Sequence, residues 1–507
     1  MSVLKKLAGE TASYGVSTML GRLLNYLLVM LHTRLFFPEQ LSVQVQLYAY
    51  AGLTLVIYTF GMETAYFRFA RKEADQRQYY NLILSAVISV SVFFSGLMYL
   101  FAEDVARLIE YPEEVTLVRW MALIMAIDGI VSIPFARLRL EKKVKKFVAA
   151  RVANILANIG FNFFFLLLCR DIYEGRYLLF LKPAVDLFYD PAMAPGYIIL
   201  ANLMANLLFF VLLCREFLDF RFVFNRALFR PVWVYAFPIL IMNLAAVTNY
   251  VFDRSFLQYL LPENFYPGRT TRDAIGIYGQ CFKLSIFMNL AIQAFKYAAE
   301  PFFFSKAEDK NAPSVFAEVM KWFVLVCILM WVGICLNLDL LAELFLRKKI
   351  YHEGLPIVPW LLLGFLFLGV YYNLAAWFKI TDKTQYGTYL TITGAAITMG
   401  LNFLLVPRIG YLGCALAFAT SALVMMGLCY YYGQKYYPVP YPVKSSAGYL
   451  LAGAALIYGS SRIEIANLWL AVPFHVFLFG LFALAVLLAE RKALPPRFRT
   501  LFGLFKV

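Results

Sequence analysis

The stretch YNLILSAVISVSVFFSGLMYLFA, residues 80–102, contains no charged residue. It is longer than the about 20 residues that a helix needs to cross the hydrocarbon core of a bilayer. Similar apolar runs predict membrane-spanning helices at 11–36, 44–67, 80–102, 117–136, 148–169, 196–214, 231–253, 274–299, 321–343, 355–378, 384–405, 411–432, 447–460 and 467–489. The sequence therefore predicts an all-α polytopic membrane protein with about fourteen transmembrane helices.

The composition of the whole chain agrees with this prediction. Of the 507 residues, 62% are hydrophobic and only 15% are charged. A soluble globular domain has about 45–50% apolar and about 25% charged residues. The excess apolar surface must therefore face lipid. The seven cysteines form no CxxC pair and there are only three histidines, so no metal site is predicted.

The net charge of +15 points either to nucleic acid or to anionic lipid as a partner. The positions of the basic residues favour the membrane, because they concentrate in alternate loops, as in the segment RLRLEKKVKK at 137–146. Basic loops mark the cytoplasmic side of a membrane protein. We therefore expect membrane lipid and no nucleic acid as a partner, and both termini in the cytoplasm.

An internal repeat divides the chain. The segment GFNF at 160–163 is echoed by GLNF at 400–403, and arginines end both the first span, at Arg34, and the seventh, at Arg254. Such repeats of about six helices are common in transporters. They predict an N-lobe at 1–230 with spans 1–6 and a C-lobe at 231–440 with spans 7–12. Spans 13 and 14 and a cytoplasmic tail follow at 441–507.

Charged and amide side chains occur inside several predicted spans, at a cost of about 2.5–3.5 kcal/mol for each charge. Helical spacing places them in stripes that suggest a hydrated, cationic cavity for an anionic substrate such as a diphosphate. The candidates from these spans, in the stripes or beside them, are Arg22, Arg34, Arg151, Asn158, Arg254, Lys283 and Lys296. The alternative is that the amides join packed helices and that Arg34 and Arg254 reach the outer interface.

Motifs for catalysis are missing from the sequence. No GxxxxGK[ST], HExxH or GxSxG pattern occurs. The chain is therefore interpreted as a secondary transporter without a cofactor, not as an enzyme. An ion gradient of H⁺ or Na⁺, the membrane potential or the substrate's own gradient would drive transport.

Several short motifs resemble a known family. They are TRLFFPE at 33–39, GMETA at 61–65, Asp253-Arg254 followed by GIY at 276–278 and Lys283, and GYLGCA at 410–415. In order and spacing they resemble the Wzx-type polysaccharide flippases of the multidrug/oligosaccharidyl-lipid/polysaccharide (MOP) exporter superfamily. By position, the resemblance makes Arg34, Glu63, Asp253, Arg254 and Lys283 candidate cavity or gate residues.

The resemblance also implies a fold and a function. The fold would be two six-helix lobes in a V, as in the MATE transporters, plus two extra helices. The function would be to flip an undecaprenyl-diphosphate-linked oligosaccharide from the cytoplasmic to the outer leaflet of a bacterial inner membrane, by alternating access. Such a step serves the biosynthesis of surface polysaccharides such as lipopolysaccharide O-antigen, and other polysaccharide-assembly proteins are then expected partners.

Two other functions stay open from the sequence. A MATE-like drug/cation antiporter would need acidic groups in its cavity, whereas the charges inside these spans are mainly basic. A membrane polysaccharide polymerase or ligase would usually carry a large outer loop with acidic residues or histidines, and the longest outer segment, about 171–195, is too short for a catalytic domain.

Overall fold

The computed structural model describes residues 26, 28–70, 73–251, 253–306, 309, 311–381, 383–463, 465 and 467–491. These residues form helices joined by short loops, and no β-strand occurs among them. Twelve of the described helical segments are long and apolar enough to cross a membrane. The all-α polytopic fold is therefore confirmed, while the predicted number of fourteen spans is not.

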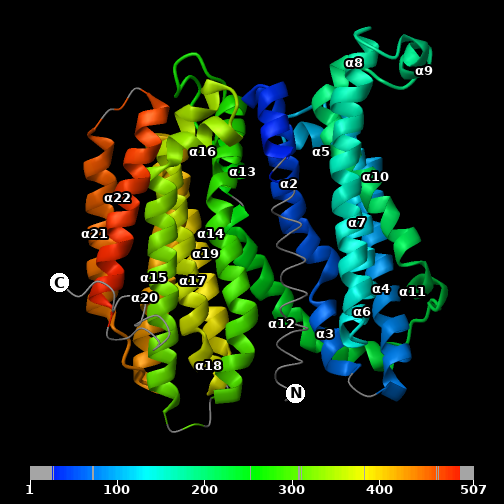
Figure 1. Cartoon of the computed structure of the whole chain (residues 1–507). Helices are drawn as coiled ribbons and strands as arrows, with labels where there is room; N and C mark the ends of the chain where they lie inside the picture. The colour runs from blue at the N-terminus through cyan, green and yellow to red at the C-terminus, as the bar shows by residue number, and fades with distance from the viewer. Residues whose placement is uncertain are drawn as a thin grey trace.

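The helices gather into two bundles (Figure 1). The first contains α2 (Pro38–Thr59), α3 (Met62–Phe69), α4 (Glu73–Leu100), α5 (Ala102–Leu108), α6 (Val115–Leu140), α7 (Val144–Phe163), α8 (Arg170–Tyr173), α9 (Lys182–Val185), α10 (Tyr197–Leu212) and α11 (Cys214–Leu218). A π-helical segment, Phe164–Cys169, joins α7 to α8, so that one long helix crosses the bundle.

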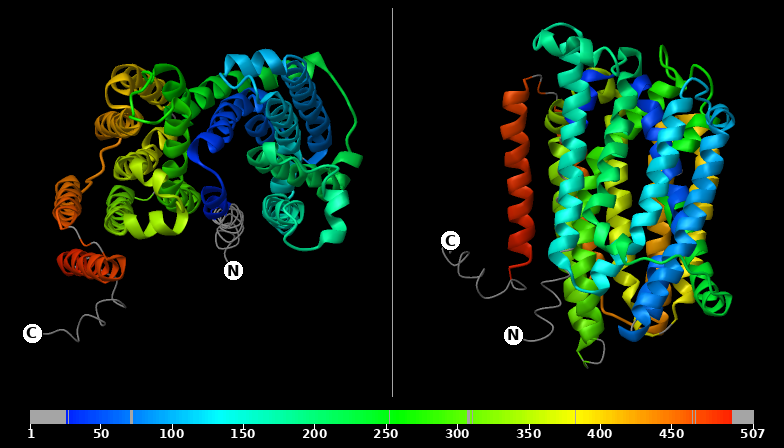
Figure 2. Two further views of the ribbon diagram at one scale, coloured as in Figure 1. Left: turned by 90° about the horizontal axis from the view of Figure 1, so that it is seen from above. Right: turned by 90° about the vertical axis from the view of Figure 1, so that its right-hand side faces the viewer.

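The second bundle contains α12 (Arg226–Val251), α13 (Asp253–Leu260), α14 (Thr271–Lys306), α15 (Ala312–Leu336), α16 (Leu338–Phe345), α17 (Val358–Leu374), α18 (Ala376–Ile380), α19 (Gln385–Ile409) and α20 (Tyr411–Tyr436). Two further helices, α21 (Val443–Ser461) and α22 (Leu468–Ala489), pack against α15 outside this bundle (Figure 2). We call the two bundles the N-lobe and the C-lobe; their limits at residues 230 and 440 stay predictions.

Two of the predicted spans differ from the helices observed, and a third cannot be compared in full. The ninth, predicted at 321–343, is α15 at 312–336, because the chain turns at Asn337 and the next apolar residues form the separate helix α16. The thirteenth corresponds to α21, which is helical but is not among the twelve segments that meet the length and hydropathy criteria for a span. The first, 11–36, lies mostly outside the described residues.

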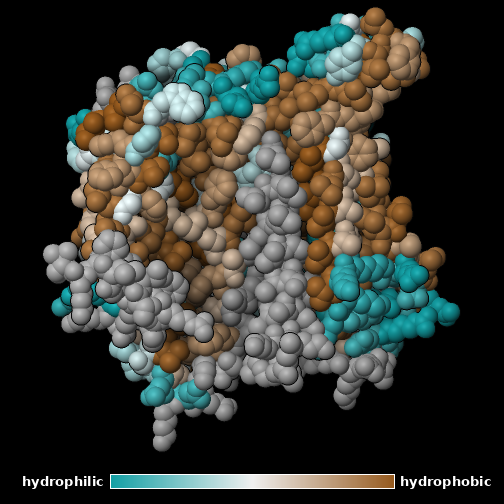
Figure 3. All heavy atoms as spheres, in the orientation of Figure 1, coloured by the Kyte–Doolittle hydropathy of each residue, from teal (hydrophilic) through white to brown (hydrophobic). Residues whose placement is uncertain are grey.

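The surface of the molecule has the layering of a membrane protein. On the face shown in Figure 3, apolar residues cover the middle of the helices and hydrophilic residues gather toward the two ends. One end, the upper face in Figure 1, carries α5, α8, α9, α13 and α16, and the other, the lower face, carries α3, α11 and α18. The loops predicted to be outside lie at the upper face and those predicted to be cytoplasmic lie at the lower face. The chain is thus a multi-pass membrane protein.

Tight turns keep neighbouring helices antiparallel and in contact. Between α19 and α20 the chain reverses at Gly410, whose φ of +61° favours glycine. A Cβ atom there would also lie 2.1 Å from the hydroxyl oxygen of Tyr266. This turn allows α19 and α20 to pack along their length, and the inner wall of the C-lobe is built on that pair.

Candidate functional site

The two lobes touch most closely where α14 crosses α2. A Cβ atom added to Gly276 would lie 2.0 Å from the carbonyl oxygen of Pro38, and one added to Gly279 would lie 2.5 Å from a methyl group of Val45. Only glycine allows the backbones to approach so closely. Both contacts lie toward the upper face, where α2 and α14 begin.

Polar contacts strengthen this junction at the upper face. Arg272, at the start of α14, forms an ion pair with Glu113 and donates to the carbonyl oxygen of Glu110 at 2.8 Å. The amide of Gln258 in α13 donates to the Glu110 carboxylate at 2.5 Å. Burial alone would raise the pKa of Glu113, but the hydrogen bond from Arg272 lowers it below its ordinary value. The loop between α5 and α6 is thus fastened to the C-lobe.

The end of the first predicted span is held in the same way. The hydroxyl of Thr33 donates to the carbonyl oxygen of Phe345 at 2.7 Å. The ammonium group of Lys348 donates to the carbonyl oxygen of Leu35 at 3.1 Å. The upper face is therefore closed between the lobes in this conformation.

Three of the predicted site residues lie just beneath this closed face. The Asp253 carboxylate is 2% exposed, lies 3.1 Å from the Arg254 guanidinium and accepts a hydrogen bond from the Tyr278 hydroxyl. The Arg254 guanidinium also lies 4.3 Å from the ring centre of Phe282. Lys283 donates to the side-chain oxygen of Gln280 at 2.9 Å. These groups form one polar cluster on α13 and α14.

The stripe on α7 makes helix-to-helix contacts within the N-lobe. Asn162 pairs with the buried ring of His32 at 2.8 Å, and its amide nitrogen donates to Asn158 in the preceding turn. Asn154 donates to Asn206 at 3.0 Å, a contact that joins α7 to α10. For these amides the structure shows the contacts expected of residues that join packed helices.

Arg151 lies deep in the N-lobe, where its side chain packs among aromatic rings. Its guanidinium lies 4.1 Å from the ring centre of Phe135, and the rings of Phe147 and Phe209 are within 5.9 Å. Asp128 on α6 supplies a nearby negative charge and accepts from Asn206 at 3.0 Å. Arg151 is thus packed among aromatic rings, with the carboxylate of Asp128 nearby.

The other candidates lie toward the two faces of the molecule. Arg34 is exposed at the upper face. Glu63, at the start of α3, pairs with Arg139 of α6 at 2.6 Å near the lower face. Arg22 lies outside the described residues.

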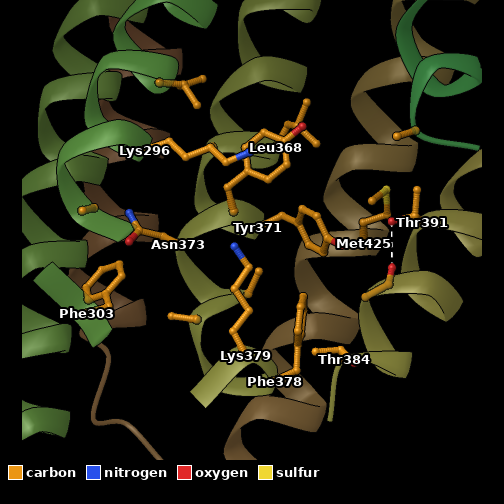
Figure 4. A pocket seen from close by; sticks show the side chains of 18 of the residues that line it. Lys296, Phe303, Leu368, Tyr371, Asn373, Phe378, Lys379, Thr384, Thr391 and Met425 are labelled. Carbon is orange, nitrogen blue, oxygen red and sulfur yellow. Dashed lines mark hydrogen bonds between the residues drawn. The ribbon is translucent and has the colours of Figure 1, made fainter. Parts of the chain in front are cut away.

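The C-lobe contains a cavity of about 430 Å³ in its lower half. We call it the C-lobe cavity, and it lies between α12, α14, α17, α18 and α19 (Figure 4). Its volume falls in the range of about 300–1,000 Å³ that is common for ligand pockets. Of the eight predicted site residues that the structure describes, only Lys296 lines it.

Two lysines and several amides supply the polar surface of the C-lobe cavity. Lys296 of α14 and Lys379 of α18 both extend into it (Figure 4). Asn373 of α17 is 5% exposed, and neither atom of its side-chain amide has a hydrogen-bond partner. Asn243 and Asn249 of α12 complete the polar lining, and none of the described lining residues is acidic. The cavity therefore offers hydrogen-bonding groups to a ligand beside two lysines.

Aromatic side chains form much of the remaining wall of the C-lobe cavity. They are Phe295, Phe303, Tyr371, Tyr372 and Phe378. The ammonium group of Lys296 lies 4.6 Å from the ring centre of Tyr372. Aromatic walls with a few polar groups are typical of small-molecule sites.

Sequence reasoning missed most of this cavity. Lys379 directly follows the predicted end of the tenth span at residue 378. The sequence therefore predicts that it is a lysine of a cytoplasmic loop. Asn373 is the one amide in the apolar run from 355 to 378. This isolated polar residue was the feature of the sequence that could have indicated the cavity. The arrangement of α12, α14 and α17 around the cavity depends on tertiary packing.

A second, apolar groove of about 450 Å³ lies on the outer side of the C-lobe. Residues of α15, α17, α20 and α21 line it, among them Ile328, Phe367, Met426 and Leu450. Because it is almost without polar atoms, it fits a hydrocarbon chain.

The fold is similar to that of solved transporters. A structure described as "Lipid II flippase MurJ, inward closed conformation" superposes with a TM-score of 0.73 at 13% identity, covering 95% of this chain and 99% of that one. An inward-facing MATE multidrug transporter of the MOP superfamily gives 0.61 at 12% identity, covering 92% and 97%. An outward-facing MATE transporter gives 0.55 at 13% identity, covering 91% and 97%. At these identities the likeness shows the fold alone.

Sequence comparison supplies the family. No curated protein matches the chain. The family model described as "Polysaccharide biosynthesis protein" matches residues 7–304, more than half of the 507 residues. The predicted resemblance is thereby confirmed at the level of the family: the chain belongs to the polysaccharide biosynthesis protein family and has the fold of the MOP transporters.

Proposed function

We propose that the protein is a flippase for an undecaprenyl-diphosphate-linked oligosaccharide. It would move this lipid from the cytoplasmic to the outer leaflet of a bacterial inner membrane, for the assembly of surface polysaccharide such as O-antigen. The family and the fold are those of membrane transporters. The observation that carries the proposal is a cavity with two lysines in its wall in the lower half of the C-lobe, beneath an upper face closed between the lobes.

This arrangement supports alternating access. The closed upper face blocks passage to the outside, while a cavity in the lower half can receive a substrate from the cytoplasm. The higher TM-score with the inward-facing than with the outward-facing MATE structure agrees with such a state. Opening the upper face and closing the lower half would then expose the same groups to the other side.

Each part of the proposed substrate meets a matching surface. Lysines at bilayer depth offset negative charge, which is costly in a low dielectric. The polyprenyl tail needs only an apolar surface, which the lipid and the groove between α17 and α21 supply. A drug/cation antiporter is less favoured, because the two lysines would repel a cationic substrate.

The proposal is tested in a strain that lacks the gene. Wild-type protein should restore surface polysaccharide, and Lys296→Gln should restore about a tenth or less, since a desolvated charge contact contributes several-fold to binding. Lys435→Gln, an exposed lysine at the end of α20, is the matched control and should behave as wild type. Full polysaccharide in the deletion strain, or drug sensitivity with normal polysaccharide, would reject the flippase function.

The location and the driving force are part of the same proposal. We propose cytoplasmic N- and C-termini and coupling to H⁺ or Na⁺ without a bound cofactor. Reporter fusions at each terminus test the orientation. Transport measured with a protonophore, and separately without Na⁺, identifies the ion. A glycosyl transfer by the purified protein would instead support a polymerase or ligase.

A further inference from the structure

A pocket at the lower face of the N-lobe lies apart from the C-lobe cavity. It has a volume of about 390 Å³ and is formed by the end of α6, the start of α7 and α11. Four basic side chains line it, those of Arg137, Lys143, Lys146 and Arg215. We propose that this N-lobe pocket binds the phosphate of an anionic phospholipid from the adjacent membrane leaflet. The inference concerns a lipid that stays in the membrane, so it goes beyond the proposed transport function.

Contacts between protein side chains build the N-lobe pocket. Glu216 of α11 is 3% exposed, and its carboxylate lies 2.5 Å from the ammonium group of Lys146 in α7. Its carbonyl oxygen accepts a hydrogen bond from the hydroxyl of Tyr80 at 2.9 Å. Arg137 of α6 reaches Asp219 at the end of α11, at 3.0 Å. These contacts fix α6, α7 and α11 relative to one another, so the basic side chains are held around one space.

The N-lobe pocket has one cation more than its carboxylates neutralise. Three of the four basic side chains form ion pairs with three carboxylates, namely Arg137 with Glu141 and Asp219, Lys143 with Glu141, and Lys146 with Glu216. Arg215, which is exposed, forms no ion pair with any residue that the structure describes. A guanidinium group is flat and presents paired donors that match a phosphate. The side chain of Lys143 is 52% exposed and can supply a second cation, so a phosphate is the expected ligand.

The apolar surface next to the N-lobe pocket indicates a lipid rather than a free anion. Figure 3 shows a hydrophilic patch at the lower right of the N-lobe, directly below the apolar surface of its helices. Leu218, which lines the pocket, is 83% exposed, and Phe210 and Val211 are exposed on α10, which leads into α11. Acyl chains can therefore lie along α10 while the phosphate reaches the pocket, because the charge of a phospholipid lies at the edge of the apolar core.

The segment that follows α11 carries exposed aromatic side chains. The N–H group of Val223 donates to the hydroxyl of the buried Ser85 in α4 at 2.9 Å, which fastens this segment to the N-lobe. Phe222 and Phe224, on either side of Val223, are each 64% exposed. Exposed phenylalanines next to basic groups are typical of segments that enter a membrane interface beside anionic lipids. This segment therefore supports the placement of the N-lobe pocket at the membrane interface.

Binding can be measured on the purified full-length protein by native mass spectrometry, without transport. The probes are the anionic lipid dioleoyl phosphatidylglycerol and the zwitterionic lipid dioleoyl phosphatidylethanolamine, with inorganic phosphate as a competitor. Phosphatidylglycerol should bind about tenfold more tightly than phosphatidylethanolamine, as expected for a hydrogen bond to a charged group. Equimolar inorganic phosphate should not displace it, because the free ion lacks the acyl chains.

Variants link the lipid preference to the N-lobe pocket. Arg215→Gln should abolish the preference for phosphatidylglycerol and leave the binding of phosphatidylethanolamine unchanged, whereas Arg215→Lys, which keeps the charge, should retain most of the preference. Leu218→Ser should weaken the binding of both lipids. Arg77→Gln changes an exposed arginine near the start of α4, outside the pocket, and is the matched control that should behave as wild type.

Three results would overturn the inference. They are equal binding or no binding of the two lipids to the wild-type protein, displacement of phosphatidylglycerol by equimolar inorganic phosphate, and a lipid preference that Arg215→Gln leaves unchanged. Each can occur whether or not the protein moves a lipid-linked oligosaccharide. A failed transport assay would in turn leave the lipid site standing, so the two proposals are tested separately.

Discussion

The side chain of Asn373 lowers the folding stability of the empty protein at the C-lobe cavity. A buried amide without partners costs about 1–3 kcal/mol relative to a satisfied one. Its neighbours in α17 are apolar and well packed, so local packing alone gives no reason for an amide at this position. The cost is explained if a ligand satisfies the amide during each transport cycle.

Asn373→Leu should therefore make the empty protein more stable while it impairs transport. Leucine has a similar size and needs no hydrogen bonds, so the unfolding transition should rise by a few degrees, corresponding to about 1–3 kcal/mol. Thermal unfolding in detergent measures the first effect and polysaccharide export the second. A variant that is less stable than wild type would show that the amide already has a structural role.

At the upper face, the ion pair between Arg272 and Glu113 should respond to pH. The pKa of Glu113 is lowered from its ordinary 4.5, so the ion pair is fully formed above that value and is lost as the pH falls through the lowered pKa. Burial and the charge of Glu113 raise the pKa of the adjacent Glu114, which protonates first. Because Glu113 is about half exposed, the contribution is only about 0.2–1 kcal/mol.

Spin labels on α5 and α13 report this change as a distance. The fraction with a closed upper face should be constant at neutral pH and should decrease as the pH falls through the lowered pKa of Glu113, below its ordinary value of 4.5. Glu113→Gln should show at every pH the closed fraction that the wild-type protein shows at low pH. An increase in the closed fraction on acidification would contradict the assigned sign.

At the scale of helices, the hydropathy of the sequence was sufficient to find most of the elements. The spans predicted at 411–432 and 384–405 correspond to α20 and α19 within a few residues. The ninth was shifted because Leu338–Phe345 is apolar enough to extend the run, although it forms a separate helix. Hydropathy reports burial or lipid contact but does not report where a helix turns.

Contacts between helices were harder to predict than the helices themselves. The charges of Arg151 and Lys296 look alike in the sequence, yet one packs on three phenylalanine rings inside the N-lobe and the other lines the C-lobe cavity. Lys379 lay outside a predicted span and was missed. Such differences depend on tertiary packing, which a single sequence does not reveal.

Gly276 sets the distance between α2 and α14, so Gly276→Ala should open the upper face. The added methyl group would meet the backbone of Pro38, which cannot move aside as a side chain can. We expect a larger distance between labels on α5 and α13 and about tenfold slower export, equivalent to about 1.4 kcal/mol. Gly400→Ala in α19, where nothing lies within 4 Å, is the control and should match wild type. An unchanged distance in Gly276→Ala would contradict the assigned contact.

At the scale of the whole molecule, the two lobes meet at the upper face where α14 crosses α2, and toward the lower face α12 packs against α2 and α3. The polar cluster beneath the upper face lies on α13 and α14, and the C-lobe cavity in the lower half lies between α12, α14, α17, α18 and α19. A lobe that packs as a unit can rotate against its partner while its own contacts persist. The molecule thus has the parts that alternating access requires.

Linking the lobes at the upper face should stop transport. Glu110→Cys and Gln258→Cys, placed where the two side chains hydrogen-bond, can be joined by a short bifunctional thiol reagent in a background without the exposed Cys214. Export should fall to the level of the deletion strain only in the joined double variant, and a cleavable reagent should restore it. Normal export with the lobes joined would exclude movement at this face.

The most direct measurement uses purified protein in vesicles that contain the strain's own lipid-linked oligosaccharide with a fluorescent label on its glycan. A membrane-impermeant quencher reports the fraction of label that has reached the outer leaflet during the experiment. With wild-type protein that fraction should rise from about half to nearly all, whereas Lys296→Gln should give a much slower rise and empty vesicles none. If wild-type protein leaves the label as protected as empty vesicles do, this protein does not carry a lipid-linked glycan across the membrane.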